Sequence, residues 1–423
     1  MAERAAAAVS LPEDAVREIL VRVESEAALF RCAVTCKRWS RLVADPSFLR
    51  RRWPDDQWVG RFLAGFFAPK RLDRTDHMFR TGEPMFATFF VPTPRSVFGP
   101  CRRSVASFSP DVDAHILDHA VPPTARRGLL LVCLASRRQY NMSVIRLAVC
   151  NLLAGVCNVL PLLSSNLEFD KSGYAILTRA DCSSSATQQS SQPGCSTFFK
   201  VLITGRRYLG LHSLYTFSSS EARWSKPIQL TLDTTEVIHD CLHPDGAVSC
   251  AKVHWSVGDW SCRCSLDMDM ETYHISQARI MTRTIYGETH DDPQLGVTTN
   301  GTPLVLTLSR PGLQLKICTQ QDDKKSEHGA IAKARRLTTR IVELKPPRQI
   351  ERRPNEIYLR LLGEKSGTML LKDSQRQIYI ADTETGVMEE FELPHGFDGL
   401  NRSKIVLLEM DWLALFVFRL GKW

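Results

Sequence analysis

Six cysteine and histidine residues lie close together in the middle of the chain and could bind a metal ion. They are Cys241, His243, Cys250, His254, Cys262 and Cys264. Structural zinc sites usually take their ligands in pairs about two to four residues apart on a tight turn. The closest pairs here are separated by one residue, which in a β-strand places both side chains on one face. This spacing favours buried strand cysteines, which behave as small apolar residues, so no metal and no cofactor is expected.

An alternating acidic row follows the cysteines and could support acid–base catalysis. It comprises Asp267, Asp269 and Glu271, and paired carboxylates can do such work when one of them is shielded from water. The row is predicted to lie in a hairpin turn, where carboxylates are normally solvated. The sequence contains no Gly-x-Ser-x-Gly elbow, phosphate-binding loop or His-Glu-x-x-His motif. We therefore expect no catalytic residue.

The overall composition is that of a globular protein with enough material for a large core. Charged residues make up 24% of the 423 residues, and the net charge of +8 is spread along the chain. A dedicated nucleic-acid binder would concentrate its basic residues. The longest apolar runs, Gly128–Ala135 and Trp412–Phe418, fall short of the roughly 18 residues needed to cross a bilayer and are predicted as buried strands. We expect neither a nucleic-acid partner nor a membrane partner.

Cysteine usage indicates the compartment. The 13 cysteines are odd in number and scattered. Residues 1–10, a lead predicted to be disordered, contain a short alanine run and no secretory signal. The cysteines are therefore expected to be reduced thiols in the cytoplasm and/or the nucleus.

A helical pattern follows the lead, from Leu11 to Val43. Its first apolar set, Val16, Ile19, Leu20 and Val23, recurs at the spacing of one helix face. Ser25 can cap a second helix, whose apolar face continues through Ala28, Leu29, Cys32, Ala33, Cys36 and Trp39. At about 40 residues this stretch is too small to bury a full core alone. It is expected either to cap the rest of the chain or to complete its core on another protein.

The same stretch resembles the F-box, the motif by which substrate receptors bind the Skp adaptor of cullin–RING ubiquitin ligases. The motif opens with Leu11-Pro12-Glu13-Asp14 and continues with Glu18-Ile19-Leu20-Val21-Arg22 and Leu29-Phe30-Arg31-Cys32. It ends with Val34-Thr35-Cys36-Lys37-Arg38-Trp39-Ser40-Arg41-Leu42. Ala15-Val16 departs from the pattern, because larger aliphatic residues are usual there. Many ordered matches over about thirty residues are a specific signal.

The resemblance implies that this module binds the adaptor and, through it, a cullin. The residues expected to be buried, partly within the module and partly against the adaptor, are Leu11, Pro12, Val16, Ile19, Leu20, Leu29, Cys32, Val34 and Trp39. Leu11-Pro12 and Ile19-Leu20 are the expected direct contacts, and Trp39 is the expected internal plug.

From Val105 onward the sequence consists of short β-type runs separated by turn residues. The clearest runs are 128–134, 144–150, 198–203, 304–308, 368–371, 377–381 and 413–418. Helical patterns are nearly absent after Phe67. This predicts an all-β region of about 320 residues, too long for one simple sandwich.

A repeated phrase suggests how the β region is arranged. A strand ends in a polar turn and a second short strand follows, at Leu147–Gly155, Ser213–Glu221, Cys264–Glu271 and Gln377–Gly386. Each copy is predicted to be a hairpin. The first three copies recur at roughly 45–70 residues, which brackets the period of propeller blades, and the fourth follows after a longer gap. A propeller of about five to seven blades would leave few exposed edges. The phrase Val149–Gly155 with Leu160-Pro161 resembles the F-box-associated, propeller-like region of plant F-box proteins, especially divergent grass members.

These observations predict a multidomain chain, α then all-β: a small helical F-box followed by a β-propeller-like domain. The expected boundaries are 1–10 for the lead, 11–53 for the F-box, 54–104 for a connecting segment and 105–423 for the propeller-like region. The connecting segment is predicted to contain a short helix over Trp58–Phe67. Two polar insertions are expected, a loop at Cys182–Thr197 and a charged loop joining blades at Asp322–Arg336.

The function expected from the resemblance is that of a non-catalytic substrate receptor. The F-box would bind the Skp adaptor, and the β region would recruit an unknown protein target for ubiquitination. The alternative is a non-ligase interaction scaffold with a propeller domain, in which the helical stretch serves another purpose. Adaptor binding distinguishes the two.

Overall fold

In the computed structural model the chain forms two compact units. The residues that the structure describes are 11–54, 62–71, 86–94, 96, 98–109, 112, 114–117, 120–134, 144–165, 167, 172–178, 181, 198–206, 212–230, 246–249, 252–258, 262–269, 275–283, 294–298, 301–309, 313–321, 336–347, 358–363, 366–373, 377–391 and 405–420. Among them, 11–54 and 411–420 form a helical unit, and 62–409 with Met410 form a β unit.

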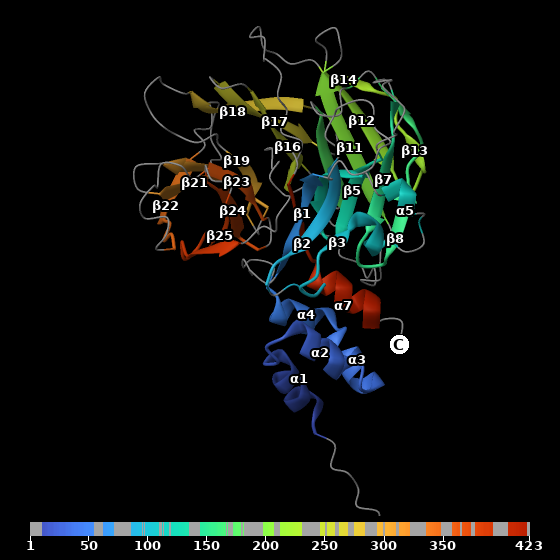
Figure 1. Ribbon diagram of the computed structural model, residues 1–423. Coiled ribbons are helices and arrows are strands. Elements are labelled where there is room, and N and C mark those ends of the chain that lie inside the picture. Colours follow the sequence, from blue (N-terminus) through green and yellow to red (C-terminus); the bar gives the residue numbers. More distant parts are fainter. Residues whose placement is uncertain are drawn as a thin grey trace, which may run out of the picture. The chain divides into compact units, whose positions relative to one another are not determined.

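The helical unit begins with four short helices (Figure 1), α1 (Glu13–Val21), α2 (Glu26–Ala33), α3 (Lys37–Val43) and α4 (Pro46–Arg52). The hydroxyl of Ser25 accepts a hydrogen bond from the Ala28 amide at 3.4 Å, so the predicted cap is confirmed. Asp45 is the N-cap residue of α4, and its carboxylate accepts hydrogen bonds from the Ser47 and Phe48 amides. Pro46 occupies the first turn of that helix, where its missing N–H is harmless.

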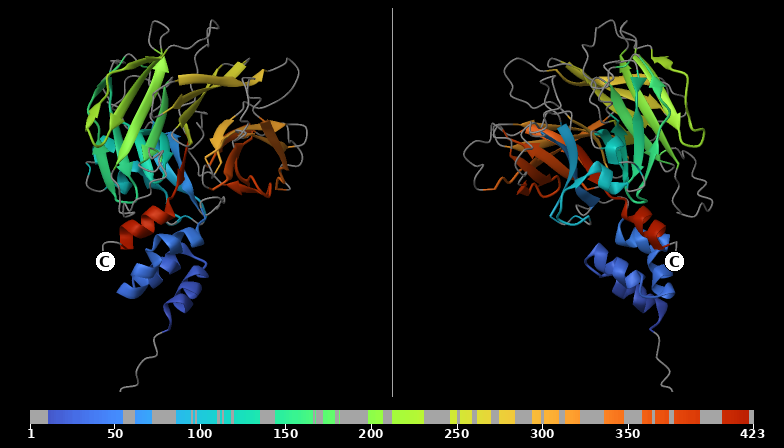
Figure 2. Two further views of the ribbon diagram at one scale, coloured as in Figure 1. Left: turned by 180° about the vertical axis from the view of Figure 1, so that it is seen from behind. Right: turned by 45° about the vertical axis from the view of Figure 1, so that its right-hand side comes forward.

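The helical unit is completed by a helix from the other end of the chain, α7 (Trp412–Leu420). Both views of Figure 2 show α7, in red, beside the blue helices. Trp412 stacks on Trp53 with ring centroids 6.3 Å apart, and Phe416 lies 5.3 Å from Trp53 and 5.8 Å from Phe30. The prediction of a buried strand over Trp412–Phe418 is therefore wrong. A short run that is apolar on all sides has no periodicity to separate a buried helix from a buried strand.

In the residues that the structure describes, the β unit contains six sheets of four or five strands each. In the order in which neighbouring strands are hydrogen-bonded, the first sheet contains β27 (Val406–Glu409), β1 (Leu63–Arg71), β2 (Phe86–Pro92) and β3 (Arg103–Ser104). The second contains β4 (Val121–Arg126), β5 (Leu129–Cys133), β7 (Leu147–Asn151) and β8 (Val156–Val159). The third contains β10 (Gly173–Thr178), β11 (Phe199–Arg206), β12 (His212–Ser218) and β13 (Arg223–Trp224), and β14 (Ile228–Leu230) also pairs with β12.

The other three sheets are simple four-stranded meanders. The first of these contains β15 (Ala247–Ser249), β16 (Lys252–Gly258), β17 (Cys262–Asp269) and β18 (Ile275–Arg283). The second contains β19 (Gln294–Val297), β20 (Pro303–Ser309), β21 (Gln314–Gln321) and β22 (Arg336–Glu343). The third contains β23 (Tyr358–Leu362), β24 (Thr368–Lys372), β25 (Ile378–Asp382) and β26 (Met388–Phe391). Smaller elements are β6 (Val144–Ile145) paired with β9 (Leu163–Ser164), a 3₁₀ turn at Val105–Phe108 and α5 (Ala114–Leu117).

The predicted helix over Trp58–Phe67 is also wrong for the part that the structure describes, because Leu63–Arg71 is strand β1. Leu63, Ala64, Phe66, Phe67 and Ala68 are all buried. A strand that is covered on both faces shows no alternation, so its aromatic residues also fit a helical face in the sequence.

The sheets follow one another in a closed series, as a propeller requires. Each sheet contributes one edge strand to this series. These edge strands contact one another in the order β27, β4, β10, β15, β19 and β23. The sixth sheet returns to the first, because Phe391 meets Phe66 at 5.1 Å and the Ser366 amide donates to the Glu409 carboxylate at 2.7 Å. This propeller-like arrangement confirms the predicted fold class, a small helical segment followed by an all-β domain.

The repeated sequence phrase corresponds to the last hairpin of a sheet. Its four copies coincide with β7–β8, β12–β13, β17–β18 and β25–β26. The charged insertion at Asp322–Arg336 lies between β21 and β22 of one sheet, so the expectation that it joins two blades is wrong. Most of it, and the insertion at Cys182–Thr197, lies outside the described residues.

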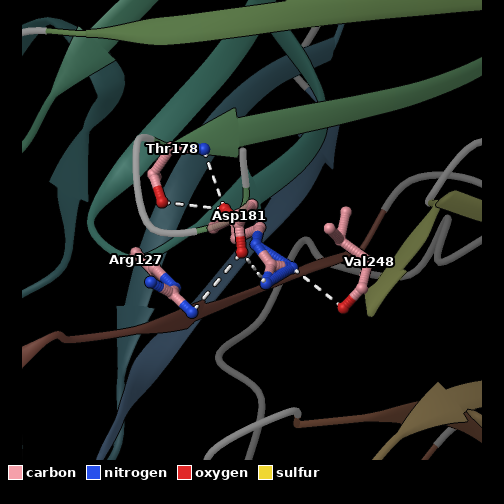
Figure 3. A network of polar contacts seen from close by, with 5 residues as sticks. Arg127, Thr178, Asp181 and Val248 are labelled. Atoms are coloured by element: carbon pink, nitrogen blue, oxygen red, sulfur yellow. Dashed lines mark hydrogen bonds and ion pairs between the residues drawn. The ribbon is translucent and has the colours of Figure 1, made fainter. Parts of the chain in front are cut away.

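A buried ionic network ties three consecutive sheets together (Figure 3). Arg126, at the end of β4, donates to Asp181 Oδ1 at 2.9 Å and to the Val248 carbonyl on β15 at 3.5 Å. Arg127 lies 3.5 Å from the same carboxylate, whose other oxygen accepts from the amide and hydroxyl of Thr178 on β10. Burial alone would raise the pKa of Asp181, but the two guanidinium groups and the Thr178 hydrogen bonds hold it below its ordinary value.

Truncating Phe416 should loosen the whole helical unit. We expect Phe416→Ala to cost about 3–5 kcal/mol, because a fully buried aromatic ring that contacts two helices is lost. Hydrogen exchange of the full chain should show faster exchange in α2 to α4, with little change in the β unit. Phe416→Leu should show a smaller effect of the same kind. Unchanged exchange in α2–α4 would mean that α7 is not part of their core.

Removing the Asp181 carboxylate should destabilise the β unit and change its response to acid. Asp181→Asn leaves two arginines without their carboxylate, and we expect a loss of about 3–5 kcal/mol. Because the folded pKa of Asp181 is lowered, its contribution is present above the ordinary value of 3.8 and is lost as the pH falls through the folded pKa. A series of melting temperatures from neutral to acid pH measures both effects.

The matched control for this network is the exposed ion pair of Arg223 with Glu221, in the same unit. Glu221→Gln should change stability by less than about 1 kcal/mol, because exposed ion pairs are screened by water. An equal effect of the two substitutions would contradict the role given to Asp181.

Candidate adaptor-binding surface

The residues expected to bind the adaptor are divided by the structure into exposed and buried groups. Leu11 is 53% exposed, Ile19 is 54% exposed, and Pro12 between them in sequence is exposed as well. Among the described residues of the helical unit, Leu11 and Ile19 are the large apolar side chains that remain exposed. Such groups at the start and on the outer side of α1 are available to a partner protein.

Three of the residues expected to be buried, within the module or against the adaptor, lie in the interior of the helical unit. Val16, Leu20 and Leu29 are 3%, 1% and 0% exposed. Leu20 was expected to be a direct contact, and the structure places it where only residues of this chain can reach it. Cys32, Val34 and Trp39 are half-buried, so Trp39 fills the unit only in part.

The Leu-Pro opening is held in place by α1 itself and by α3. Pro12 is the N-cap residue of α1, and its carbonyl accepts a hydrogen bond from the Val16 amide at 3.1 Å. The carbonyl of Leu11 accepts from the Arg38 guanidinium, on α3, at 2.6 Å. Glu13 and Asp14 occupy the first turn, where the helix dipole favours negative charge. The exposed Leu11 side chain therefore extends from a fixed backbone.

The other end of α1 is held by α4. Arg52 donates to the carbonyls of Val21, Val23 and Glu24, the last at 3.1 Å, which supplies partners for the free end of the helix. The Arg52 guanidinium also lies 5.7 Å from the centre of the Trp53 ring. Since Trp53 contacts α7, one arginine links the end of α1 to the aromatic core of the unit.

Surface charges add weaker connections between the same helices. Arg51 pairs with Glu18, and Arg17 lies 3.7 Å from Asp45. The pKa of Asp45 is lowered, chiefly because the Ser47 hydroxyl and then the backbone amides of α4 donate to its carboxylate. The lowered pKa favours the ionised form of Asp45, which caps α4.

Sequence reasoning missed Arg38, Arg52 and the pair Phe30–Phe416. Arginines carry no signal in a hydrophobic pattern, and their function here depends on backbone carbonyls that are distant in sequence. The chemistry of an unsatisfied helix end does predict that some donor must reach the carbonyls after Val21. It does not say which residue supplies it.

The candidate metal and acidic clusters are only partly within the described residues. His254 is buried, and its ring lies 2.6 Å from the Ser249 hydroxyl. Cys241, His243 and Cys250 are outside the described residues, as is Glu271. Asp267 and Asp269 belong to strand β17, so their predicted place in a turn is wrong. Across the residues described, no group of three or more His, Cys, Asp or Glu side chains could hold a metal ion.

No helix in the described part of the chain is long and apolar enough to cross a membrane.

The comparison with protein families identifies the helical stretch. Residues 9–51 match the family model of the F-box domain. The chain therefore carries an F-box domain at its N-terminal side. The match spans α1 to α4, so Leu11, Pro12 and Ile19 are exposed apolar residues of the F-box, whereas α7 lies outside the matched range.

Comparisons over the whole chain are much weaker. No curated protein matches the sequence. AofleA from Arthrobotrys oligospora aligns with 10% identity and a TM-score of 0.40, over 80% of this chain and 89% of its own. The Pseudomonas aeruginosa periplasmic gluconolactonase PpgL aligns with 10% identity and a TM-score of 0.37, over 78% of this chain and 82% of its own. The Dos1 propeller aligns with 12% identity and a TM-score of 0.31, over 74% of this chain and 68% of its own. At these TM-scores the similarities indicate neither an activity nor a partner.

Replacing Arg52 should free the end of α1. We expect Arg52→Met, which keeps the apolar stem, to destabilise the F-box by about 2–3 kcal/mol, because several charge-assisted hydrogen bonds to carbonyls are lost. Amide exchange in α1 should accelerate. Arg31→Met, at an exposed position near the end of α2, is the control and should leave that exchange unchanged. Equal exchange in the two variants would show that Arg52 does not fasten α1.

Proposed function

We propose that this chain is a substrate-recognition subunit of an SCF-type ubiquitin ligase. The F-box would bind a Skp-type adaptor, and through it a cullin, while the β unit would hold a protein target for ubiquitination. Ubiquitin transfer would be carried out by partner enzymes, so the chain itself would be non-catalytic. The single observation that carries the proposal is an F-box that exposes Leu11 and Ile19 on a fixed first helix.

The exposed group supports a more specific interface than the sequence alone. Leu11, Pro12 and Ile19 are the proposed direct contacts. Val16, Leu20 and Leu29 would support them from within, because buried side chains cannot reach a partner without unfolding. Large apolar residues on rigid backbone are typical of interface anchors, since little conformational entropy is lost when they bind.

The β unit supports the second half of the proposal. A closed series of sheets provides a large rigid surface next to its strand ends and turns, and such surfaces recognise varied partners in propellers.

We also propose that the chain belongs to the plant F-box group, because Val149–Gly155 resembles its F-box-associated region. A cytoplasmic and/or nuclear location is proposed from the expected reduced cysteines.

Substituting Ile19 tests the proposed interface. Ile19→Arg places a charge in the contact without disturbing the core, because the native side chain is about half exposed. We expect adaptor affinity to fall by about 2–4 kcal/mol, roughly 30- to 1,000-fold in Kd. Titration of a purified Skp-type adaptor with the full chain measures this. Leu20→Arg is a poor test, since it would unfold the F-box and abolish binding for that reason.

The matched control is Ile341→Arg, at a similarly exposed isoleucine of the β unit (59%). It should leave adaptor affinity unchanged. If Ile19→Arg and the wild type bind equally well, the proposed contact is wrong. If the wild-type chain binds no adaptor at all, the non-ligase scaffold becomes the better explanation.

A further inference from the structure

Two cysteines face each other across the last hairpin of the second sheet. Cys150 on β7 and Cys157 on β8 are direct register partners, and their Sγ atoms are 3.0 Å apart. Both are free thiols in this structure. The adaptor-binding surface uses neither residue, and they lie in the β unit rather than in the F-box.

The backbone at this pair is suited to a disulfide. Cys150 is two residues before Leu152, whose amide donates to the Gly128 carbonyl on the β5 side. On the other side of β7, the Leu160 amide donates to the Leu147 carbonyl. Because hydrogen-bonded and open pairs alternate along antiparallel strands, Cys150 and Cys157 form an open pair, whose Cα atoms are about 4.5 Å apart. That spacing is within the range of about 4.4–6.8 Å that disulfides require, so no strand has to move.

The two thiols are not equivalent. Cys150 is fully buried, whereas Cys157 is only half-buried. The Cys150 thiol donates a hydrogen bond to Cys157 Sγ. This hydrogen bond lowers the pKa of Cys157, and the same contact together with burial raises the pKa of Cys150. Cys157 is therefore the thiol that ionises more readily and that an oxidant can reach, and Cys150 is the thiol held against it.

We propose that Cys150 and Cys157 form a reversible thiol–disulfide site that is oxidised by peroxide. The Cys157 thiolate attacks one oxygen of hydrogen peroxide. The O–O bond breaks, hydroxide departs, and Cys157 becomes a sulfenic acid. The Cys150 sulfur then attacks the Cys157 sulfur, the S–O bond breaks, and the oxygen leaves as water with the proton of Cys150. Two thiols and one peroxide thus give one disulfide and two waters. A dithiol reductant reverses the reaction by exchange.

The location of the pair gives the oxidation a structural consequence. β8 is the outer strand of its sheet and exposes Val156 and Val159, which are 44% and 56% exposed. A disulfide would fix this edge strand to β7. In a reducing compartment the dithiol is the resting form, and a disulfide there is transient and reports oxidation.

Peptide mass measurement on the full chain tests the proposal directly. Trypsin releases a fragment from Leu147 to Lys171 that contains Cys150 and Cys157 and no other cysteine. After mild peroxide treatment and alkylation with N-ethylmaleimide, most of this fragment should be two hydrogens lighter and carry no label. Dithiothreitol added before alkylation should restore both labels. Cys101, which is exposed, should stay labelled at the same dose and serves as the internal control.

Two variants separate the roles of the thiols. In Cys150→Ser, Cys157 should accumulate sulfenic acid that dimedone traps, whereas in Cys157→Ser the buried Cys150 should keep its maleimide label. The wild-type measurement needs no variant and stands even if Cys150→Ser folds poorly. The proposal is overturned if both cysteines of the wild-type fragment remain labelled at doses that already oxidise Cys101, or if their loss is not reversed by dithiothreitol.

Discussion

The pairing of β1 with β27 is the constraint on which the β unit depends. Leu63 is the register partner of Glu409, and the Met410 amide donates to the Phe62 carbonyl at 2.8 Å. This ladder joins the first strand of the β unit to its last and so closes the series of sheets, as propellers must to avoid free edges. It also brings the chain segment that enters the β unit alongside the one that leaves it. Within the helical unit, the segments from the two ends of the chain also meet, because Trp53 stacks on Trp412.

The helical unit could be predicted from the sequence only in part. The F-box was recognisable because its residues occur in order over one continuous stretch, and Val16, Ile19 and Leu20 recur at the helical spacing. Helix α7 was not recognisable in the sequence, because its partners Phe30 and Trp53 lie more than 350 residues away and its own residues are apolar on every side. The contact depends on the tertiary structure, and no local pattern records it.

The β unit shows a similar division. Hairpins such as β25–β26 were predicted correctly, because turn residues between two short strands specify a hairpin locally. The order of strands within a sheet and the joints between sheets were not predictable. The joint made by Arg126 and Asp181 depends on residues 55 apart that become one buried ion pair only when β4 and β10 are neighbours. The opposed thiols of Cys150 and Cys157, by contrast, follow from the predicted hairpin once its register is known.

The contribution of α7 changes how the candidate adaptor-binding surface should be understood. A module of about 40 residues that lacked a core would have to fold as it bound, and part of its binding energy would be spent on ordering it. Here Phe416 and Trp412 are 1% and 3% exposed within the helical unit, so this chain supplies the missing apolar contacts itself. The F-box is then ordered before a partner arrives, and a partner needs to cover only side chains such as Leu11 and Ile19. A few exposed residues on a rigid helix can thus support binding, because the entropy of ordering that helix has already been offset by the core behind it.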